Sequence, residues 1–324
     1  MASTQWWRAI EDEEIAALAA ATTEVVHRIG DDLSALRTCS VDDLIGTPMI
    51  ARLANEVRSE LVDGKGFVVL RGLPVDRWSR RNTFIAYWLL GNTLGQPVPN
   101  NSLGDMIGHV ADLGRDVDAA TTRGYDTNAQ LAYHCDQCSI VGLICLQKSK
   151  SGGLSKLVSS MALHDVIGAN RPDLLEILCG PFCYSRLGEE VPGQRPWYFA
   201  HVFERAEDGL RCAAGFLHIR KGHELPGAPE MTERQREALL YLEEVCPSIE
   251  FAMDFEPGDI QLLNNGVVLH NRTAFEDWPE LERRRHLLRL WLRVPEMHRG
   301  ASYFENWRNG VIPADGTPKF RLTP

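Results

Sequence analysis

The sequence has no long apolar run, little clustered basic charge and a low density of cysteine. No window in its 324 residues reaches the roughly 18 consecutive apolar residues that a membrane helix needs, so no membrane span is expected. The only basic cluster is Arg283-Arg284-Arg285 and the formal net charge is −10, which argues against nucleic acid as a partner. Eight cysteines, spread from Cys39 to Cys246, do not suggest a disulfide scaffold.

The first twenty residues, MASTQWWRAIEDEEIAALAA, also lack the features of a secretory signal. They carry acidic residues where a signal peptide needs a basic region followed by an apolar run. We therefore expect a soluble, intracellular and cytoplasmic protein. Cysteines in apolar runs such as GLICLQ are expected to be buried and reduced. A small molecule is the expected partner, and a homo-oligomer stays open.

The order of helical and strand patterns predicts one domain, residues 1–324, with helices around a β-rich core. Residues 1–64 are mainly helical in pattern, and strand-like segments with turn signals follow over residues 65–295. Between about residues 98 and 130 a polar, Gly- and Asp-rich stretch has no clear period, which is typical of a functional lid. Residues 296–324 form a C-terminal extension. Short strands at irregular spacing favour a β-sandwich or jelly roll with helices outside.

Two later segments give specific secondary-structure predictions. CAAGFLHIR, from Cys212, is one of the late segments that we predict to be strands. TERQREALLYLEEVC predicts a helix that is opened by a capping box between Thr232 and Gln235.

Two different metal sites can be drawn through the stretch AYHCDQC. Cys135 and Cys138 form a Cys-x-x-Cys pair of the kind that holds zinc, whereas His134 and Asp136 suit a harder metal such as Fe(II). Alternate residues of a strand point the same way, so His134 and Asp136 would face one cavity while the cysteines point away. No second Cys-x-x-Cys or Cys/His pair closes a four-ligand zinc site, which disfavours zinc.

A His-x-Asp pattern carries little weight alone. With ten histidines and 44 acidic residues, chance gives about one His-x-Asp/Glu pattern in a chain of this length. A third ligand is needed, and His270 ends the apolar run VVLH in the segment EPGDIQLLNNGVVLHNRTAFED. By residue pattern alone, a lone histidine there is more often a hydrogen-bonded core residue.

Two segments give His270 a context. YHCDQCSIVGLICLQKSKSGGLSKLVSS and GDIQLLNNGVVLHNRTAFEDWPELERRRHLLRLWLR resemble the taurine dioxygenase/TfdA family, the Fe(II)- and 2-oxoglutarate-dependent oxygenases related to clavaminate synthase. GFVVLRGLPVDRWS and GQPVPN agree, so the resemblance covers about residues 65–295. It implies a double-stranded β-helix, the cupin-like jelly roll, with flanking helices. It also implies oxidation of an unactivated C–H bond of a small polar, amino-acid-like or carboxylate-bearing metabolite, chiefly hydroxylation, with release of succinate and CO2.

The resemblance assigns roles to individual residues. The iron ligands would be His134, Asp136 and His270, a facial triad that leaves three positions for 2-oxoglutarate and O2. The distal carboxylate of 2-oxoglutarate would be gripped by an arginine of an Arg-Arg-x-x-x-Arg pattern, with Arg289 as first choice and Arg285 as the alternative. Ser155, in a Gly-Gly-x-Ser turn, would add a hydrogen bond to that carboxylate.

The substrate and the rival functions are less constrained. The lid offers four candidate substrate contacts, which are His109, Arg123, Tyr125 and Asn128. Relatives that halogenate have Gly or Ala where Asp136 stands, so halogenation is disfavoured. The alternatives are a catalytically inactive cupin-like binding protein and a zinc hydrolase that uses His134 and His270.

Overall fold

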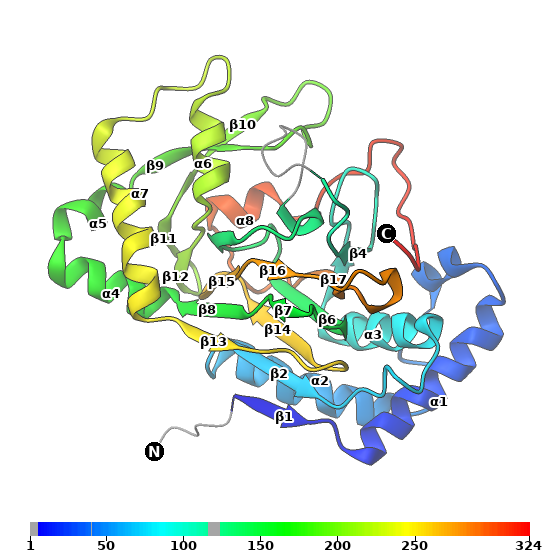
Figure 1. The fold of residues 1–324 in the computed structure, drawn as a ribbon. Coiled ribbons are helices and arrows are strands. Elements are labelled where there is room, and N and C mark those ends of the chain that lie inside the picture. Colours follow the sequence, from blue (N-terminus) through cyan, green and yellow to red (C-terminus); the bar gives the residue numbers. More distant parts are fainter. Residues whose placement is uncertain (1–5, 40, 116–123) are drawn as a thin grey trace.

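The computed structural model describes residues 6–39, 41–115 and 124–324, and Figure 1 shows their arrangement. Two sheets, antiparallel except for one pair of strands, form the centre of the molecule, with helices outside them. The predicted lid segment is described on both sides of residues 116–123, so Arg123 lies outside the described residues. No helix in the described ranges is both long and apolar enough to cross a membrane.

The larger sheet has seven strands, and its order does not follow the chain. β1 pairs with β2 in parallel, and all its other pairings are antiparallel. β17 pairs with β6, β3 and β4. In sheet order, with β4 off the path, the strands are β1 (Trp7–Ala9), β2 (Phe67–Arg71), β14 (Ile260–Asn264), β6 (Ile140–Gln147), β17 (His286–Arg293), β3 (Gln96–Val98) and β4 (Ile107–Val110).

The smaller sheet has four strands and carries most of the candidate metal ligands. Its order is β13 (Phe251–Met253), β8 (Ser155–Ser159), β15 (Val268–Arg272) and β5 (Leu131–His134), all antiparallel. Three short pairs complete the β structure: β7 (Ser151–Gly152) with β16 (Phe275–Glu276), β9 (Pro181–Ser185) with β10 (Trp197–His201), and β11 (Phe203–Ala206) with β12 (Gly209–Cys212).

The N-terminal helices cover the larger sheet. α1 (Asp12–Ile29), the 3-10 turn Leu33–Thr38, α2 (Thr47–Val62) and α3 (Arg80–Leu94) bury their apolar faces in one cluster with β2, β6, β14 and β17. Figure 1 shows these helices in blue and cyan along one side of the molecule. Residues 1–64 are thus mainly helical as predicted, but β1 in this region joins the sheet, which the sequence did not predict.

The remaining helices lie mostly on the other side of the molecule (Figure 1). They are α4 (Ser160–Asn170), α5 (Pro172–Leu178), α6 (Phe216–His223), α7 (Glu233–Val245) and α8 (Ser302–Asn306). The predicted capping box of α7 is confirmed, because Thr232 and Gln235 bond each other's backbone N–H groups. The strand predicted for CAAGFLHIR is wrong beyond Cys212, because Phe216 begins α6.

Candidate metal centre and substrate pocket

His134 and His270 lie opposite each other on neighbouring strands. His134 ends β5 and pairs across the sheet with His270, the middle residue of β15, and the two ring centroids are 4.2 Å apart. Asp136 follows β5 by two residues, and its backbone N–H donates to Asn265 Oδ1 at 3.1 Å. The fold therefore brings together the three residues that the sequence singled out.

The donor atoms of these residues can converge on one ion. One ligand atom from each of His134, Asp136 and His270 lies within 4.8 Å of the other two. Asp136 Oδ2 is 3.9 Å from His270 Nε2, a gap that one ion bonded to both at about 2 Å can bridge. His134 Nδ1 donates to the Ala132 carbonyl at 2.8 Å, which leaves Nε2 free to bind metal. Two imidazoles and one carboxylate are the donor set of non-haem Fe(II) sites.

The ionisation of the centre also suits a metal. Burial disfavours the charged form of Asp136, but Arg289 and the two imidazoles outweigh it and lower the pKa of this carboxyl below its usual value. Burial is the main reason that the pKa of His270 falls to about 3, and His134 contributes less. At neutral pH the centre therefore offers a carboxylate and, at His270, a neutral imidazole, which are the forms that bind a metal.

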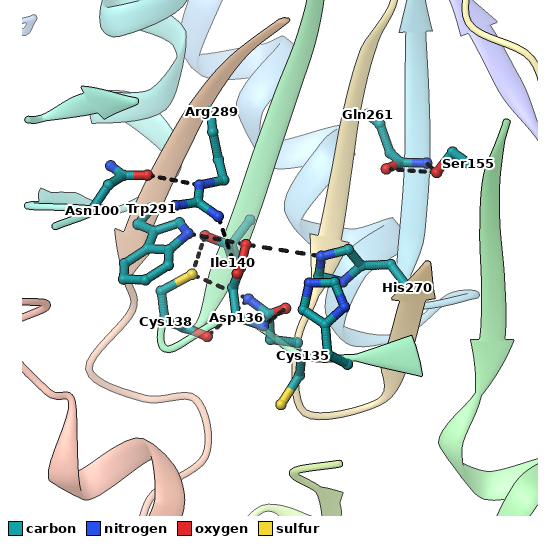
Figure 2. A network of polar contacts seen from close by, with 12 residues as sticks. Asn100, Cys135, Asp136, Cys138, Ile140, Ser155, Gln261, His270, Arg289 and Trp291 are labelled. Atoms are coloured by element: carbon teal, nitrogen blue, oxygen red, sulfur yellow. Dashed lines mark hydrogen bonds and ion pairs between the residues drawn. The ribbon is translucent and has the colours of Figure 1, made fainter. Parts of the chain in front are cut away.

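Two side chains of β17 hold the carboxylate of Asp136 (Figure 2). Trp291 Nε1–H donates to Asp136 Oδ2 at 3.0 Å, and Arg289 Nη1 lies 3.4 Å from Oδ1. Arg289 is itself held, because its Nε–H donates to Asn100 Oδ1 at 3.1 Å and its guanidinium lies 4.4 Å from the ring centroid of Tyr125. These contacts fix the orientation of the carboxylate before any ion binds.

We expect Trp291→Phe to weaken Fe(II) binding by about tenfold, because it keeps a buried ring but removes the N–H donor to Asp136. Anaerobic metal titration measures this effect. Trp197→Phe is the matched control, since it loses an indole bond to the Pro226 carbonyl outside the pocket and should bind Fe(II) like the parent. Equal Fe(II) affinity in Trp291→Phe and the parent would show that this bond does not orient the ligand.

A cavity of about 160 Å³ opens beside the metal-binding residues. Leu131 to Gln137 supply one wall, with Arg289 and Trp291 of β17 adjoining it, and the first turns of α6 supply another. Its further lining includes Tyr125, Leu187, Phe216, Leu217, His218 and Lys221. The metal centre is therefore open to a small molecule on this side.

The predicted substrate contacts do not all line the cavity. Tyr125 lines the cavity. His109 does not, because its imidazole bonds His286 at 2.9 Å and the Arg321 carbonyl at 3.0 Å. Asn128 is also outside the lining, and its carbonyl accepts from the Phe275 N–H. Arg123 lies beyond the described residues.

The cavity also has walls that the sequence did not assign to it. Leu187, in the loop after β9, has a left-handed φ of 56°, which leucine rarely adopts. Phe216, Leu217, His218 and Lys221 come from α6, where the sequence predicted a strand. The sequence did contain a signal for this wall, the basic stretch HIRKGH. Which of its side chains face the cavity could be determined only once the segment was known to be a helix.

Two buried arginines form a second polar site beside the metal centre. Arg272 follows His270 by two residues on β15, so the two side chains leave the same face of the strand, about 7 Å apart along it. Arg272 and Arg285 are 6% and 5% exposed, and both have guanidinium N–H groups without a partner among the described residues. Burial lowers the pKa of both, and Arg285 helps to lower that of Arg272 to about 9.

The Gly-Gly-x-Ser turn packs against these arginines. Ser155 faces Arg272 across the β8–β15 pair, and its hydroxyl accepts from Gln261 Nε2 at 3.0 Å. A Cβ at Gly153 would lie 3.2 Å from Arg285 Nε, and its φ of 74° also favours glycine. Ser155 and Arg285 therefore lie in one region, whereas Arg289 lies beside Asp136.

Residues 45–291 match the model of the taurine catabolism dioxygenase TauD, TfdA family. The chain belongs to this family. TauD/TfdA proteins are Fe(II)- and 2-oxoglutarate-dependent dioxygenases, and this chain is one of them. The sequence-based recognition is therefore confirmed, and the His-Asp-His set and the buried arginines fit those two cofactors.

Two curated relatives support the assignment. FR-33289 synthase of Streptomyces rubellomurinus (strain ATCC 31215) is 30% identical over 248 residues, which are 75% of this chain and 73% of that protein. The taurine hydroxylase-like protein SAT17 of Stachybotrys chartarum (strain CBS 109288 / IBT 7711) is 30% identical over 243 residues, which are 70% of this chain and 60% of that protein.

Solved structures share the fold of this TauD/TfdA dioxygenase. Asparagine oxygenase in complex with Fe(II), 2S,3S-3-hydroxyasparagine and succinate has a TM-score of 0.66 at 17% identity, covering 89% of this chain and 94% of that one. The non-haem iron oxygenase OrfP in complex with Fe, succinate and (3S)-hydroxy-L-Arg has a TM-score of 0.64 at 15% identity, covering 92% and 98%.

The cysteines of this TauD/TfdA dioxygenase do not join the metal-binding set. Among the described residues, the one group that could hold a metal is His134, Asp136 and His270. The sulfur of Cys135 points away from that group in Figure 2, and Cys138 Sγ accepts from Asn265 Nδ2 at 3.1 Å. Burial raises the pKa of both thiols, which opposes the thiolate that zinc requires.

We therefore expect Cys135→Ser and Cys138→Ser to keep the parent's Fe(II) stoichiometry. Each variant buries a hydroxyl in place of a thiol, so some loss of thermal stability is expected without loss of iron. Metal analysis after anaerobic loading makes the comparison. Loss of metal in both folded variants would instead support the zinc site.

Proposed function

We propose that this dioxygenase hydroxylates an unactivated C–H bond of a small, amino-acid-like metabolite. The observation that carries the proposal is the convergence of His134, Asp136 and His270 beside a small-molecule cavity. The structural neighbours support the substrate class, since their complexes contain 3-hydroxyasparagine and 3-hydroxyarginine. When bound, Fe(II) and 2-oxoglutarate supply the oxidising power and release succinate and CO2.

In this proposal His134, Asp136 and His270 hold the iron, and Trp291 and Arg289 orient Asp136. The contact of Arg289 with Asp136 also balances its charge inside the buried centre. Retention of Asp136 favours hydroxylation over halogenation, because the carboxylate occupies the position that a halide would need. The apolar rings and leucines of the cavity wall keep water away from the reacting carbon.

We propose that Arg285, with Arg272 beside it, holds the distal carboxylate of 2-oxoglutarate, and that Ser155 adds a hydrogen bond. Two buried guanidiniums with unpartnered N–H groups are costly, and a carboxylate between them would satisfy both. The position of Arg272 two residues after His270 suits a cosubstrate that reaches from the metal toward the arginines. Arg289, the first choice from the sequence, is already bonded to Asp136 and Asn100.

We infer that the seven-stranded and four-stranded sheets are the two halves of the double-stranded β-helix, and that residues 1–324 fold as one domain. His270 on the smaller sheet and Trp291 on the larger one meet at Asp136, which supports a site enclosed between the two halves. An inactive binding protein would not account for the complete triad. A zinc hydrolase would not account for Arg272 and Arg285.

Succinate release tests the proposed function. The purified protein, loaded with Fe(II), should convert 2-oxoglutarate to succinate slowly alone and faster with its substrate, and only when O2 is present. A screen of L-amino acids with mass detection of a product 16 units heavier identifies the substrate. If the Fe(II)-loaded protein releases no more succinate than the metal-free protein, the function is wrong.

A further inference from the structure

We propose that the side chain of the amino-acid-like substrate ends in an anionic group, a carboxylate or a phosphoryl-type oxyanion, that is bound by Lys221. Lys221 lies on the α6 side of the cavity, which also borders the metal centre. This inference rests on the proposed function, since it takes the cavity as the substrate pocket. It adds the charge at the end of the substrate's side chain and the residue that selects it.

The packing of α6 turns Lys221 toward the cavity. A Cβ at Gly222 would lie 2.2 Å from the Cys183 carbonyl oxygen, so only glycine lets the helix sit this close to β9. Ile219 is fully buried, and the imidazole of His223 accepts the Cys183 N–H at 3.1 Å. Through these contacts one face of α6 packs against β9, and the adjoining face, with His218 and Lys221, lines the cavity.

The charges of the residues that line the cavity indicate that Lys221 lacks an anionic partner among them. The cavity lining has two formal cations, Arg289 and Lys221, and one carboxylate, Asp136. Arg289 Nη1 lies 3.4 Å from Asp136, so those charges offset each other. Lys221 is half-buried and has no hydrogen bond or ion pair to any residue that the structure describes. Lys221 is therefore the cation of the cavity lining that no carboxylate among the described residues offsets.

An ammonium group in a confined pocket is best satisfied by an anion, because charge-assisted hydrogen bonds are the stronger kind. An amide oxygen at the same place would accept a hydrogen bond from Lys221 but leave its charge unbalanced, and a guanidinium would be repelled. The pocket therefore favours substrates with an acidic end over the neutral or cationic side chains of asparagine and arginine. Carboxylate and phosphoryl-type groups both meet this requirement, and they differ in shape and charge.

Anaerobic calorimetry on the protein loaded with Fe(II) and 2-oxoglutarate tests this selectivity. The probes are L-aspartate, L-2-amino-3-phosphonopropionate and L-asparagine, which differ at the terminal group. We expect at least one acidic probe to bind about tenfold or more tightly than L-asparagine. The tighter of the two acidic probes identifies the kind of anion.

Lys221→Gln should abolish this preference, and Lys221→Glu should reverse it. Arg220→Gln is the matched control, because Arg220 is a cation on the same helix that is exposed and outside the cavity lining. If no acidic probe binds more tightly than L-asparagine, or if the preference survives in Lys221→Gln, the inference is wrong. Succinate release by the parent separates the two claims. Its absence refutes the proposed function, whereas succinate release without acid preference refutes only the role of Lys221.

Discussion

His270→Ala is expected to lose iron and, with it, nearly all conversion of 2-oxoglutarate to succinate. The variant removes one of the three donors that lie within 4.8 Å of one another, and among the described residues no fourth His, Cys, Asp or Glu belongs to this group. Loss of residues that only support a ligand costs about 10-fold to 100-fold in metal affinity, so loss of a ligand should cost roughly a hundredfold or more. Equilibrium titration with Fe(II) under anaerobic conditions measures the affinity directly.

His164→Ala is the matched control for that experiment. His164 lies on α4, pairs with Asp165 and is not part of the metal-binding set. Its variant should keep the parent's Fe(II) affinity and succinate release. Circular dichroism and the thermal midpoint establish whether His270→Ala is folded. A folded His270→Ala protein with the parent's iron affinity would remove His270 from the centre.

Arg285→Met should raise the 2-oxoglutarate concentration needed for half-maximal turnover by more than about a hundredfold. Breaking a buried ion pair by removing one partner costs about 3–5 kcal/mol, which corresponds to that factor. Methionine keeps much of the buried volume while it removes the charge. Without cosubstrate, the change relieves an unpaired guanidinium beside Arg272, so the free protein should be no less stable than the parent.

Two variants separate Arg285 from its neighbours. Arg284→Met should leave the 2-oxoglutarate requirement unchanged, since the Arg284 guanidinium bonds the carbonyls of Trp278 and Pro279. Arg289→Met should weaken Fe(II) binding first, because Arg289 contacts Asp136. If Arg289→Met steeply raises the 2-oxoglutarate concentration that turnover requires and Arg285→Met does not, then Arg289, the first choice from the sequence, binds the distal carboxylate.

The grouping of the three proposed metal ligands could be predicted because short-range and family-level signals agree. The pattern His134-x-Asp136 lies at a strand end, and the resemblance supplied His270, which no local pattern distinguishes from a core histidine. Their meeting depends on the pairing of β5 with β15, a contact between residues more than a hundred positions apart. The helical layer and the capping box of α7 follow local patterns and were predicted from them.

The choice between Arg289 and Arg285 as the proposed cosubstrate arginine, and the walls of the pocket, depended on the structure. Strand alternation put Arg285 and Arg289 on one face, but β17 begins only at His286 and its register with β6 shifts between His286 and Leu287. CAAGFLHIR was predicted to be a strand, yet Gly222 allows a helix to pack on β9. Both outcomes depend on tertiary packing, which overrides local preference.

Anomalous diffraction at the iron edge, from anaerobic crystals grown with Fe(II) and 2-oxoglutarate, would locate the metal itself. We expect one iron peak between His134, Asp136 and His270, with the distal carboxylate of 2-oxoglutarate against Arg285 and Arg272. An iron peak at Cys135 and Cys138, or no peak among the three ligands in crystals that contain iron, would contradict this expectation.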